Sequence, residues 1–429
     1  MWYVLIMAVL LNACTFNEDI NKDPNNPTNA PLNALLSPSE ILIAYTWGGN
    51  YSRYNGMFTQ QLFGFDRQAA TIYNYQFKRS DTDDPWDNLY RAMLNNKDII
   101  DRASTTSPHY SGVAKVLMAY SLGSLTSMYG DIPYSEALKG ADNSTQPKYD
   151  SQESIYNQIQ ALLDQAIVDF GTENNGLAPS TDDIIYSGDI PSWKALAFAL
   201  KARYHLHTAK VRPTAYNSAI ASVDSAIANG FVDFKLTFDG ASATTEAPWY
   251  QWNDQRGDII PNEYMFGLMD TIADPRLSTF FDVTTAGGFG EAFGTYLQGA
   301  TGPVLMMSRY ELYYILAECY FALGDEANAA SNLKLAVEAS YSDVGTTGTY
   351  TPPTPLDLKT IMLQKYFAFY LNPECFVDWR RTGFPEIVPV DGVAVPRKYP
   401  YPTKEKNYNG GNTPDEGTQP YLKRMWIDP

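Results

Sequence analysis

The sequence is poor in the side chains that bind metals or form covalent cross-links. It contains three cysteines and three histidines in 429 residues. His205 and His207 are two positions apart, so they cannot share one face of a helix. Beyond Cys14 only Cys319 and Cys375 remain, too few for a disulfide framework, and Cys319 lies in an apolar helical pattern that predicts a buried thiol. We therefore expect no Cys/His metal centre and no cofactor.

Basic residues are also scarce. The chain has 31 Lys and Arg against 48 Asp and Glu, a formal net charge of −17. This balance argues against a nucleic-acid-binding protein, because phosphates require Lys and Arg. It also argues against docking on an anionic membrane through a basic patch.

The first 31 residues have the order of a secretory signal followed by a tether. Residues 1–11 are almost all apolar, with no Lys or Arg before them, and are too few to span a bilayer, which takes about 20 residues. The segment Leu11-Asn12-Ala13-Cys14 resembles a bacterial lipobox, in which the cysteine becomes the new N-terminus and its sulfur carries a lipid. The sequence predicts a signal peptide over residues 1–13, lipidation of Cys14, and an extended tether over residues 14–31.

The tether carries a partial calcium-binding pattern. Asp19, Asn21, Asp23 and Asn25 alternate as the oxygen ligands of a calcium loop do. The glycine and the distal glutamate that complete such a loop are missing, so a structural calcium ion lacks support. A solvated linker is the favoured interpretation, and its prolines keep it extended.

Residues 32–429 are expected to form a single, mainly α-helical domain. Residues 38–62 start at a Ser37-Pro38 cap and have helical periodicity with a break at Gly48-Gly49. Further helices are predicted over residues 84–100, 110–129, 151–170, 191–209, 213–229, 262–281, 308–340 and 356–370. Loops are predicted over residues 63–82, 230–260 and 284–305, and surface coil from residue 386.

Residues 308–340 fit the tetratricopeptide pattern of small and large residues across a helix pair. Residues 120–137 and 195–226 repeat a weaker form of this pattern. The repeats of a free-standing solenoid adjoin one another, whereas these are widely spaced. We therefore expect degenerate helix pairs with long loops inserted between them.

Several stretches, in order along nearly the whole chain, resemble the SusD/RagB family of outer-membrane lipoproteins, and within it the SusD-like subgroup. Each stretch alone is a weak signal, but the ordered set is specific. The stretches are residues 19–27, Tyr129-Gly130-Asp131-Ile132-Pro133-Tyr134-Ser135-Glu136-Ala137, Asp274-Pro275-Arg276-Leu277, Gln364-Lys365-Tyr366, Trp379-Arg380-Arg381-Thr382-Gly383 and residues 397–409.

The resemblance implies a fold and a function. The implied fold is α-rich, with three or four tetratricopeptide-like helix pairs supporting a loop-rich ligand-binding half. Members of this family are cell-surface lids of SusC-like TonB-dependent transporters. They capture oligosaccharides, or in some members oligopeptides, for import, and they carry out no covalent chemistry. A glycan is the expected ligand, with a peptide as the alternative.

Two polar motifs are interpreted as structural. Trp379-Arg380-Arg381 is expected to pack and pair across helices, since guanidinium groups stack on rings and bind acids. Gly130-Asp131 is expected to stop a helix. Nucleophile-elbow, zinc-protease and phosphate-loop motifs are absent from the sequence. A surface glycoside hydrolase with paired carboxylates and a protein-binding adaptor are kept as alternatives.

Aromatic residues are plentiful, with 31 Tyr and 8 Trp. Rings offer apolar faces for sugars or side chains, and nearby amides and carboxylates fix the ligand's orientation. We therefore predict ligand contacts from the ring-rich stretches without periodicity, with packing as the alternative role of each ring. The candidates are Trp47, Tyr51, Tyr54, Tyr73, Asn74, Tyr75, Trp249, Tyr250, Trp252, Asn253, Asp254 and Arg256.

Overall fold

The computed structural model describes residues 30–139, 145–284, 287–297 and 299–428. The predicted signal peptide, Cys14, the calcium-like pattern and nearly all of the tether lie outside these residues. Among the described residues, no helix has both the length and the apolar character needed to cross a bilayer. No cluster of three His, Cys, Asp or Glu side chains suited to a metal ion is found in the same part of the chain.

The fold is mainly α-helical, as predicted. The helices are α2 Leu32–Thr46, α3 Ser52–Phe58, α4 Arg67–Tyr73, α5 Asp83–Ala103, α6 Pro108–Tyr129, α7 Gln152–Asp169, α8 Ile190–Thr208, α9 Ala215–Ala228, α10 Pro248–Gln255, α11 Glu263–Thr271, α12 Leu277–Phe280, α13 Arg309–Ala322, α14 Glu326–Asp343, α15 Leu358–Ala368, α16 Glu374–Thr382 and α17 Thr403–Tyr408. Antiparallel two-stranded sheets join β1 Leu62–Gly64 to β3 Ile259–Pro261, β2 Phe234–Thr237 to β6 Pro303–Met307, and β4 Phe281–Val283 to β5 Phe289–Phe293.

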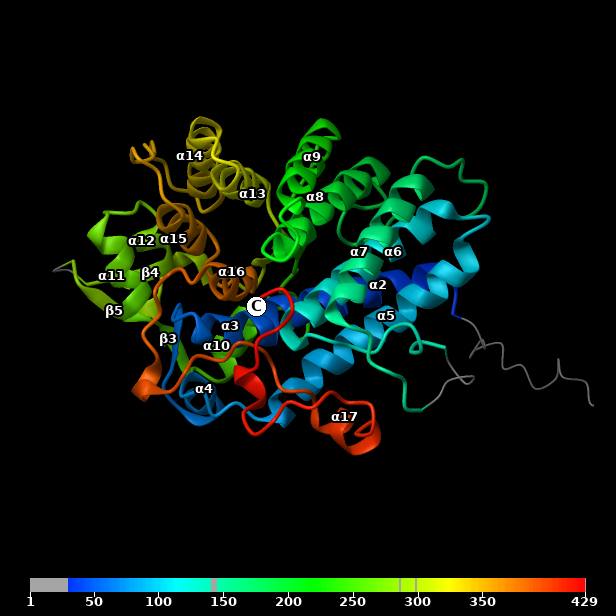
Figure 1. Cartoon of the computed structure of the whole chain (residues 1–429), viewed down its shortest axis with the longest axis horizontal. Coiled ribbons are helices and arrows are strands. Elements are labelled where there is room, and N and C mark those ends of the chain that lie inside the picture. The colour runs from blue at the N-terminus through cyan, green and yellow to red at the C-terminus, as the bar shows by residue number, and fades with distance from the viewer. Residues whose placement is uncertain (1–29, 140–144, 285–286, 298, 429) are drawn as a thin grey trace, which may run out of the picture.

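Packed helix pairs form the scaffold. The pairs are α2/α5, α6/α7, α8/α9 and α13/α14, and α7 also contacts α8 as α9 contacts α13. Figure 1 shows three of these pairs side by side along the upper part of the molecule, with α3, α4 and α10 below them. The expected architecture of helix pairs with inserted loops is therefore confirmed.

One predicted pair is wrong. Residues 120–137 contain only the end of α6 and the segment after it, and the partner of α6 is α7. Gly130 ends α6 with a φ of +86°, a conformation that glycine adopts without steric cost. The backbone N–H of Gln152 donates to Asp131 Oδ1 across 2.8 Å, so Gly130-Asp131 stops one helix and holds the start of the next.

Two predicted loops contain short helices. Helix α4 lies within residues 63–82, where the Asp66 carboxylate caps the amide of Arg67 at 2.8 Å and Ile72 is buried. Helix α10 lies within residues 230–260 and starts at Pro248. These helices have 7 and 8 residues, about two turns, which is too short to show a helical period in the sequence.

The predicted start of the first helix is also wrong. Helix α2 begins at Leu32, and Pro38 lies inside it. The missing amide of a proline normally ends a helix. Here Leu36 and Ile43 are fully buried on either side of Pro38, so tertiary packing continues the helix through it.

Part of the tail after residue 386 belongs to the core, and for that part the prediction of surface coil is wrong. The ring of Tyr399 meets the rings of Tyr51, Phe77 and Tyr129 edge-on, at centroid distances of 5.5, 5.0 and 5.5 Å. Its hydroxyl donates to Asn55 Oδ1 at 2.7 Å. Tyr401 is buried beside Tyr129. The tail thus completes the aromatic core between α3 and α6.

Buried ion pairs join the helices, and the arginine motif has the structural role that we predicted. Arg381 binds both oxygens of Glu318 on α13 and donates to Asp378 Oδ1 at 2.7 Å. Arg380 donates to the carbonyl of Ser127 at 2.6 Å. All these residues are buried, and Ser127 takes part through its backbone carbonyl.

The two described cysteines, Cys319 and Cys375, are buried free thiols, in agreement with the expectation for Cys319. His207 is buried and lies between the hydroxyl of Tyr156 at 3.0 Å and Glu374 Oε2 at 2.9 Å. Burial raises the pKa of Glu374, but the nearby His207 and Arg203 outweigh burial and hold this pKa below its usual value. His207 and Glu374 therefore act as a buried polar pair within the core.

Candidate functional site

A break between α2 and α3 shapes the surface beside it. The π-helical turn Trp47–Tyr51 joins the two helices, and Gly49 within it has non-helical angles, φ −99° and ψ −106°. At Gly48 a Cβ atom would lie 2.4 Å from Val304 Cγ2, so only glycine allows β6 to approach this closely. The predicted break at Gly48-Gly49 is confirmed, and Gly49 lines a cavity.

This cavity has a volume of about 470 Å³. Its walls come from three segments that are far apart in the sequence: α2 to α3, the start of α5, and α10. We call it the Trp252 pocket. Its lining residues are Tyr45, Thr46, Gly49, Asn50, Arg53, Asp84, Pro85, Asn88, Pro248, Gln251, Trp252 and Gln255.

Trp252 is held in place on α10 by a hydrogen bond at its edge and by two cations against its ring. Its indole Nε1 donates to Asp258 Oδ1 at 3.0 Å. The guanidinium carbons of Arg53 and Arg256 lie 3.9 and 4.6 Å from its ring centroid. Arg256 in turn pairs with Asp258 at 2.8 Å. The indole therefore has a fixed orientation in the pocket wall before any ligand arrives.

Polar groups face one another across the pocket. The Tyr45 hydroxyl donates to Gln251 Oε1 at 2.5 Å, which joins α2 to α10. Burial raises the pKa of Tyr45, so this hydroxyl keeps its proton at neutral pH. The side-chain amides of Asn50 and Asn88 add donors and acceptors to the same lining. A ring with convergent amides and a hydroxyl suits a polar ligand that has apolar faces.

Five of the predicted ligand-binding rings are buried in this structure and offer no open face. They are Trp47, Tyr51, Tyr54, Tyr75 and Trp249. Tyr51 and Tyr54 pack against Tyr399, at centroid distances of 5.5 and 6.1 Å, and Tyr75 packs against Phe58 at 6.2 Å. Their abundance in one region reflects the aromatic core and not an aromatic surface.

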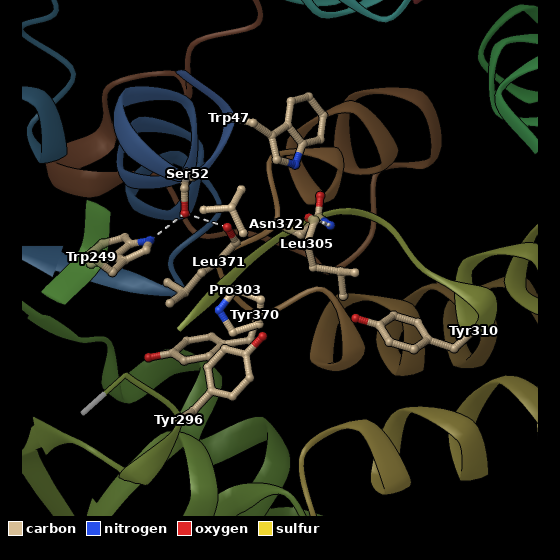
Figure 2. Close-up of a pocket in the computed structure, with 12 residues that line it drawn as sticks. Trp47, Ser52, Trp249, Tyr296, Pro303, Leu305, Tyr310, Tyr370, Leu371 and Asn372 are labelled. Carbon is tan, nitrogen blue, oxygen red and sulfur yellow. Dashed lines mark hydrogen bonds between the residues drawn. The ribbon is translucent and has the colours of Figure 1, made fainter. Parts of the chain in front are cut away.

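Trp47 and Trp249 line a second, smaller cavity. Figure 2 shows the indole of Trp249 donating to Ser52 Oγ at 2.8 Å, and Ser52 donating to the carbonyl of Leu371 at 2.5 Å. The volume of this cavity is about 60 Å³. That is room for one or two water molecules and not for a sugar ring. This small cavity is a packing gap where α3, α10 and the chain before α16 meet.

The remaining predicted residues divide between the pocket and its surroundings. Trp252 lines the pocket, and Arg256 lies on its ring. The ring of Tyr73 meets that of Phe63 at 4.8 Å, away from the pocket lining. Three of the others, Asn74, Asn253 and Asp254, are exposed, and Tyr250 is half-buried, outside the lining.

Eight polar lining residues were not predicted from the sequence: Tyr45, Thr46, Asn50, Arg53, Asp84, Asn88, Gln251 and Gln255. The sequence could have indicated four of them. The predicted glycine break is flanked by Tyr45, Asn50 and Arg53, and Gln251 lies between two of the predicted rings. Nothing in the sequence indicated Asn88, because only the tertiary structure brings α5 to this pocket.

The fold and the pocket define a class of protein: a scaffold of helix pairs that carries a ring-lined, polar pocket in its inserted segments. The chain belongs to the SusD-like family, whose model, described as "Starch-binding associating with outer membrane", matches residues 24–402. The predicted resemblance is thereby confirmed.

Solved structures share the fold over almost the whole chain. A SusD/RagB family protein from Bacteroides thetaiotaomicron is 20% identical, with a TM-score of 0.78 over 93% of this chain and 99% of that one. A chitin-binding SusD homologue from Flavobacterium johnsoniae is 20% identical, with a TM-score of 0.77 over 92% and 98%. A SusD homologue from Bacteroides uniformis is 20% identical, with a TM-score of 0.74 over 92% and 99%. A comparison with curated protein sequences finds no match.

Proposed function

We propose that this chain is a cell-surface lipoprotein that captures glycans in the Trp252 pocket and delivers them to a SusC-like TonB-dependent transporter, without catalysis. The description of the family, starch binding at the outer membrane, supports this function. A relative that binds chitin supports a glycan over a peptide. The single observation that carries the proposal is the fixed Trp252 ring among amides in a cavity of about 470 Å³.

The physical case rests on the surfaces of a sugar. A pyranose ring has apolar faces that stack on an indole, and equatorial hydroxyls that need donors and acceptors. The part of the Trp252 indole that Arg53 and Arg256 leave uncovered supplies an apolar contact, while Asn50, Asn88 and Gln251 supply donors and acceptors. The cavity volume falls within the range of about 300–1,000 Å³ that is common for small-molecule sites.

The lining also bears on the choice between binding and hydrolysis. A glycosidase places two carboxyl groups on either side of the bond that it cleaves. Asp84 is the one carboxylate among the lining residues of the Trp252 pocket, and it is exposed. The composition of the pocket therefore favours a binding protein over the alternative of a glycoside hydrolase.

Binding of neutral oligosaccharides to the soluble domain tests the proposal. We expect chito- or malto-oligosaccharides to bind in calorimetry without being shortened, and Trp252→Ala to weaken binding by about tenfold or more. Trp426→Ala is the control, because Trp426 is a half-buried ring that lines a different cavity and lies under Arg212. Equal affinities of the wild type and Trp252→Ala, or release of shorter sugars, would contradict the proposal.

The anchor and the partner need separate tests, because Cys14 and the tether lie outside the described residues. Cys14→Ser should release the protein from outer membranes during a carbonate wash. Residues 15–31 reach at most about 50–60 Å when fully extended. Shortening this tether should impair uptake by the cell and leave the glycan affinity of the isolated domain unchanged. Retention of Cys14→Ser on the membrane would refute the lipid anchor.

A further inference from the structure

Arg53 is a buried cation at the wall of the Trp252 pocket. Arg53 is 6% exposed, and its side chain lines the cavity. Nη2 donates to Asn50 Oδ1, and the guanidinium lies over the Trp252 ring. Its Nε atom is buried without a hydrogen-bond acceptor among the described residues. Within that same set of residues, no carboxylate lies within 4.0 Å of its nitrogens.

The other buried arginines are neutralised in a different way. Arg203 pairs with Glu311 at 2.6 Å, Arg276 pairs with Asp274 at 2.6 Å, and Arg381 binds both oxygens of Glu318. Arg380 instead donates to several backbone carbonyls, including that of Ser127. Arg53 has neither arrangement, so its position differs from that of a structural arginine.

The surroundings leave the charge of Arg53 only partly compensated. Burial lowers its pKa to about 10, Tyr54 and Asp258 oppose this shift, and Arg256 adds to it. The guanidinium is therefore still charged at neutral pH. Asp258 is already occupied by an ion pair with Arg256. A buried charge without a partner is unfavourable, and an anion that reaches it regains the lost interaction.

We propose that the Trp252 pocket selects an acidic sugar, whose carboxylate or sulfate group pairs with Arg53 beside Trp252. This inference rests on the proposed function and names the substrate class of the same site. A carboxylate accepts two parallel hydrogen bonds from a guanidinium, which fixes both the charge and the orientation of the sugar. Asn50 and Asn88 then meet the remaining hydroxyls.

Asp84 sets the limit of this selectivity. It is exposed, lines the same pocket, and lies beyond 4.0 Å from Arg53. Its negative charge repels an acidic ligand, although solvent weakens this repulsion at an exposed position. Asp84→Asn is therefore expected to strengthen the binding of an acidic sugar relative to that of its neutral partner.

Matched sugars with and without the acidic group test the inference. The carboxylate probe is a hexamer of galacturonic acid with its methyl ester as the neutral partner. The sulfate probe is a 6-sulfated chito-oligosaccharide with its unsulfated parent. The wild type should bind the acidic member of at least one pair about 10- to 100-fold more tightly, which is the range for a hydrogen-bonded charge. The pair that shows the preference identifies the source of the anion.

Variants of Arg53 connect the preference to this side chain. Arg53→Gln should abolish the difference within the pair, and Arg53→Lys, which keeps the charge, should retain part of it. Arg91→Gln is the control, because Arg91 is an exposed arginine on α5 that lines a different cavity. Melting temperatures check that the variants fold. If Arg53→Gln does not fold, the comparison of Arg53→Lys with the wild type is the test.

The outcomes separate this inference from the proposed function. Equal binding of acidic and neutral sugars by the wild type, with binding still lost in Trp252→Ala, overturns the acidic preference alone. Tighter binding of a tetraglutamate peptide than of either acidic sugar overturns the assignment to sugars. Failure of every sugar to bind overturns the proposed function together with the inference.

Discussion

The indole nitrogen of Trp249 lies 2.8 Å from the hydroxyl oxygen of Ser52, to which it donates a hydrogen bond. This bond connects α10 to α3 inside the molecule. Trp252 lies one turn further along α10, on the wall of the pocket. Because residues three apart on a helix are neighbours, the buried indole positions the half-exposed one.

Trp249→Phe should therefore weaken ligand binding, although residue 249 does not line the Trp252 pocket. Phenylalanine keeps most of the buried ring but loses the donor, which leaves less to hold α10 against α3. We expect a loss of about 1–2 kcal/mol in the free energy of unfolding and a measurable fall in glycan affinity. Calorimetry and urea denaturation check both effects. A variant with reduced stability and wild-type affinity would contradict the positioning role.

Gly48→Ala should destabilise the protein because the new Cβ atom would lie 2.4 Å from Val304 Cγ2. Overpacking of this kind costs about 1–3 kcal/mol, measured as a lower urea midpoint. The second substitution Val304→Ala removes the clashing methyl groups and should recover part of the loss. Gly267→Ala is the matched control, since nothing lies within 4 Å of a Cβ atom there and α11 favours alanine. A stable Gly48→Ala would contradict the close packing.

Arg381→Gln should be among the most destabilising substitutions. It leaves Glu318 buried and charged without its bidentate partner, at a cost of about 3–5 kcal/mol. Adding Glu318→Gln should restore part of the stability, because the uncompensated charge is removed. Lys97→Gln breaks an exposed pair with Asp101 and should cost no more than about 0.5 kcal/mol. Chemical denaturation of the variants gives these differences, and similar losses for both sites would contradict the prediction.

Acidification should destabilise the protein in part through His205. Burial and the nearby Lys201 lower the pKa of His205 to about 4, while in the unfolded chain it titrates near 6.5. The unfolded state therefore binds more protons between these values, and stability falls as the pH drops from about 6.5 to 4. His205→Gln should lose less in melting temperature than the wild type between pH 7.5 and pH 5. Parallel losses would contradict this assignment.

The helix pairs were predictable because their helices are long and one-sided. In α7, Ser151 caps the start and Ile155, Ile159 and Leu163 are buried on one face, as their spacing in the sequence indicates. Helical periodicity and the proline rule did not predict α4, α10 or the start of α2 correctly. Two turns give no period, and Pro38 is overridden by contacts with residues far along the chain.

The pocket was less predictable, since its composition is a product of tertiary structure. Aromatic residues dominate the same stretches of sequence whether they face a ligand or a core, and most of them here face the core, as Tyr51 and Trp249 do. What distinguishes Trp252 is its position on a short helix opposite Arg53 and Asn88, two residues supplied by other elements. Residue type alone does not contain this information.

The burial of Tyr399 has a consequence for how the chain acquires its structure. Residues near position 50 and position 129 cannot finish packing until the segment around position 399 has emerged from the ribosome. An incomplete chain exposes the rings of Tyr51 and Tyr129, so it is a substrate for chaperones and proteases. Completion of the core is thus coupled to synthesis of the segment around Tyr399, and a chain that stops short of this segment lacks the ring contacts that hold Tyr51 and Tyr129.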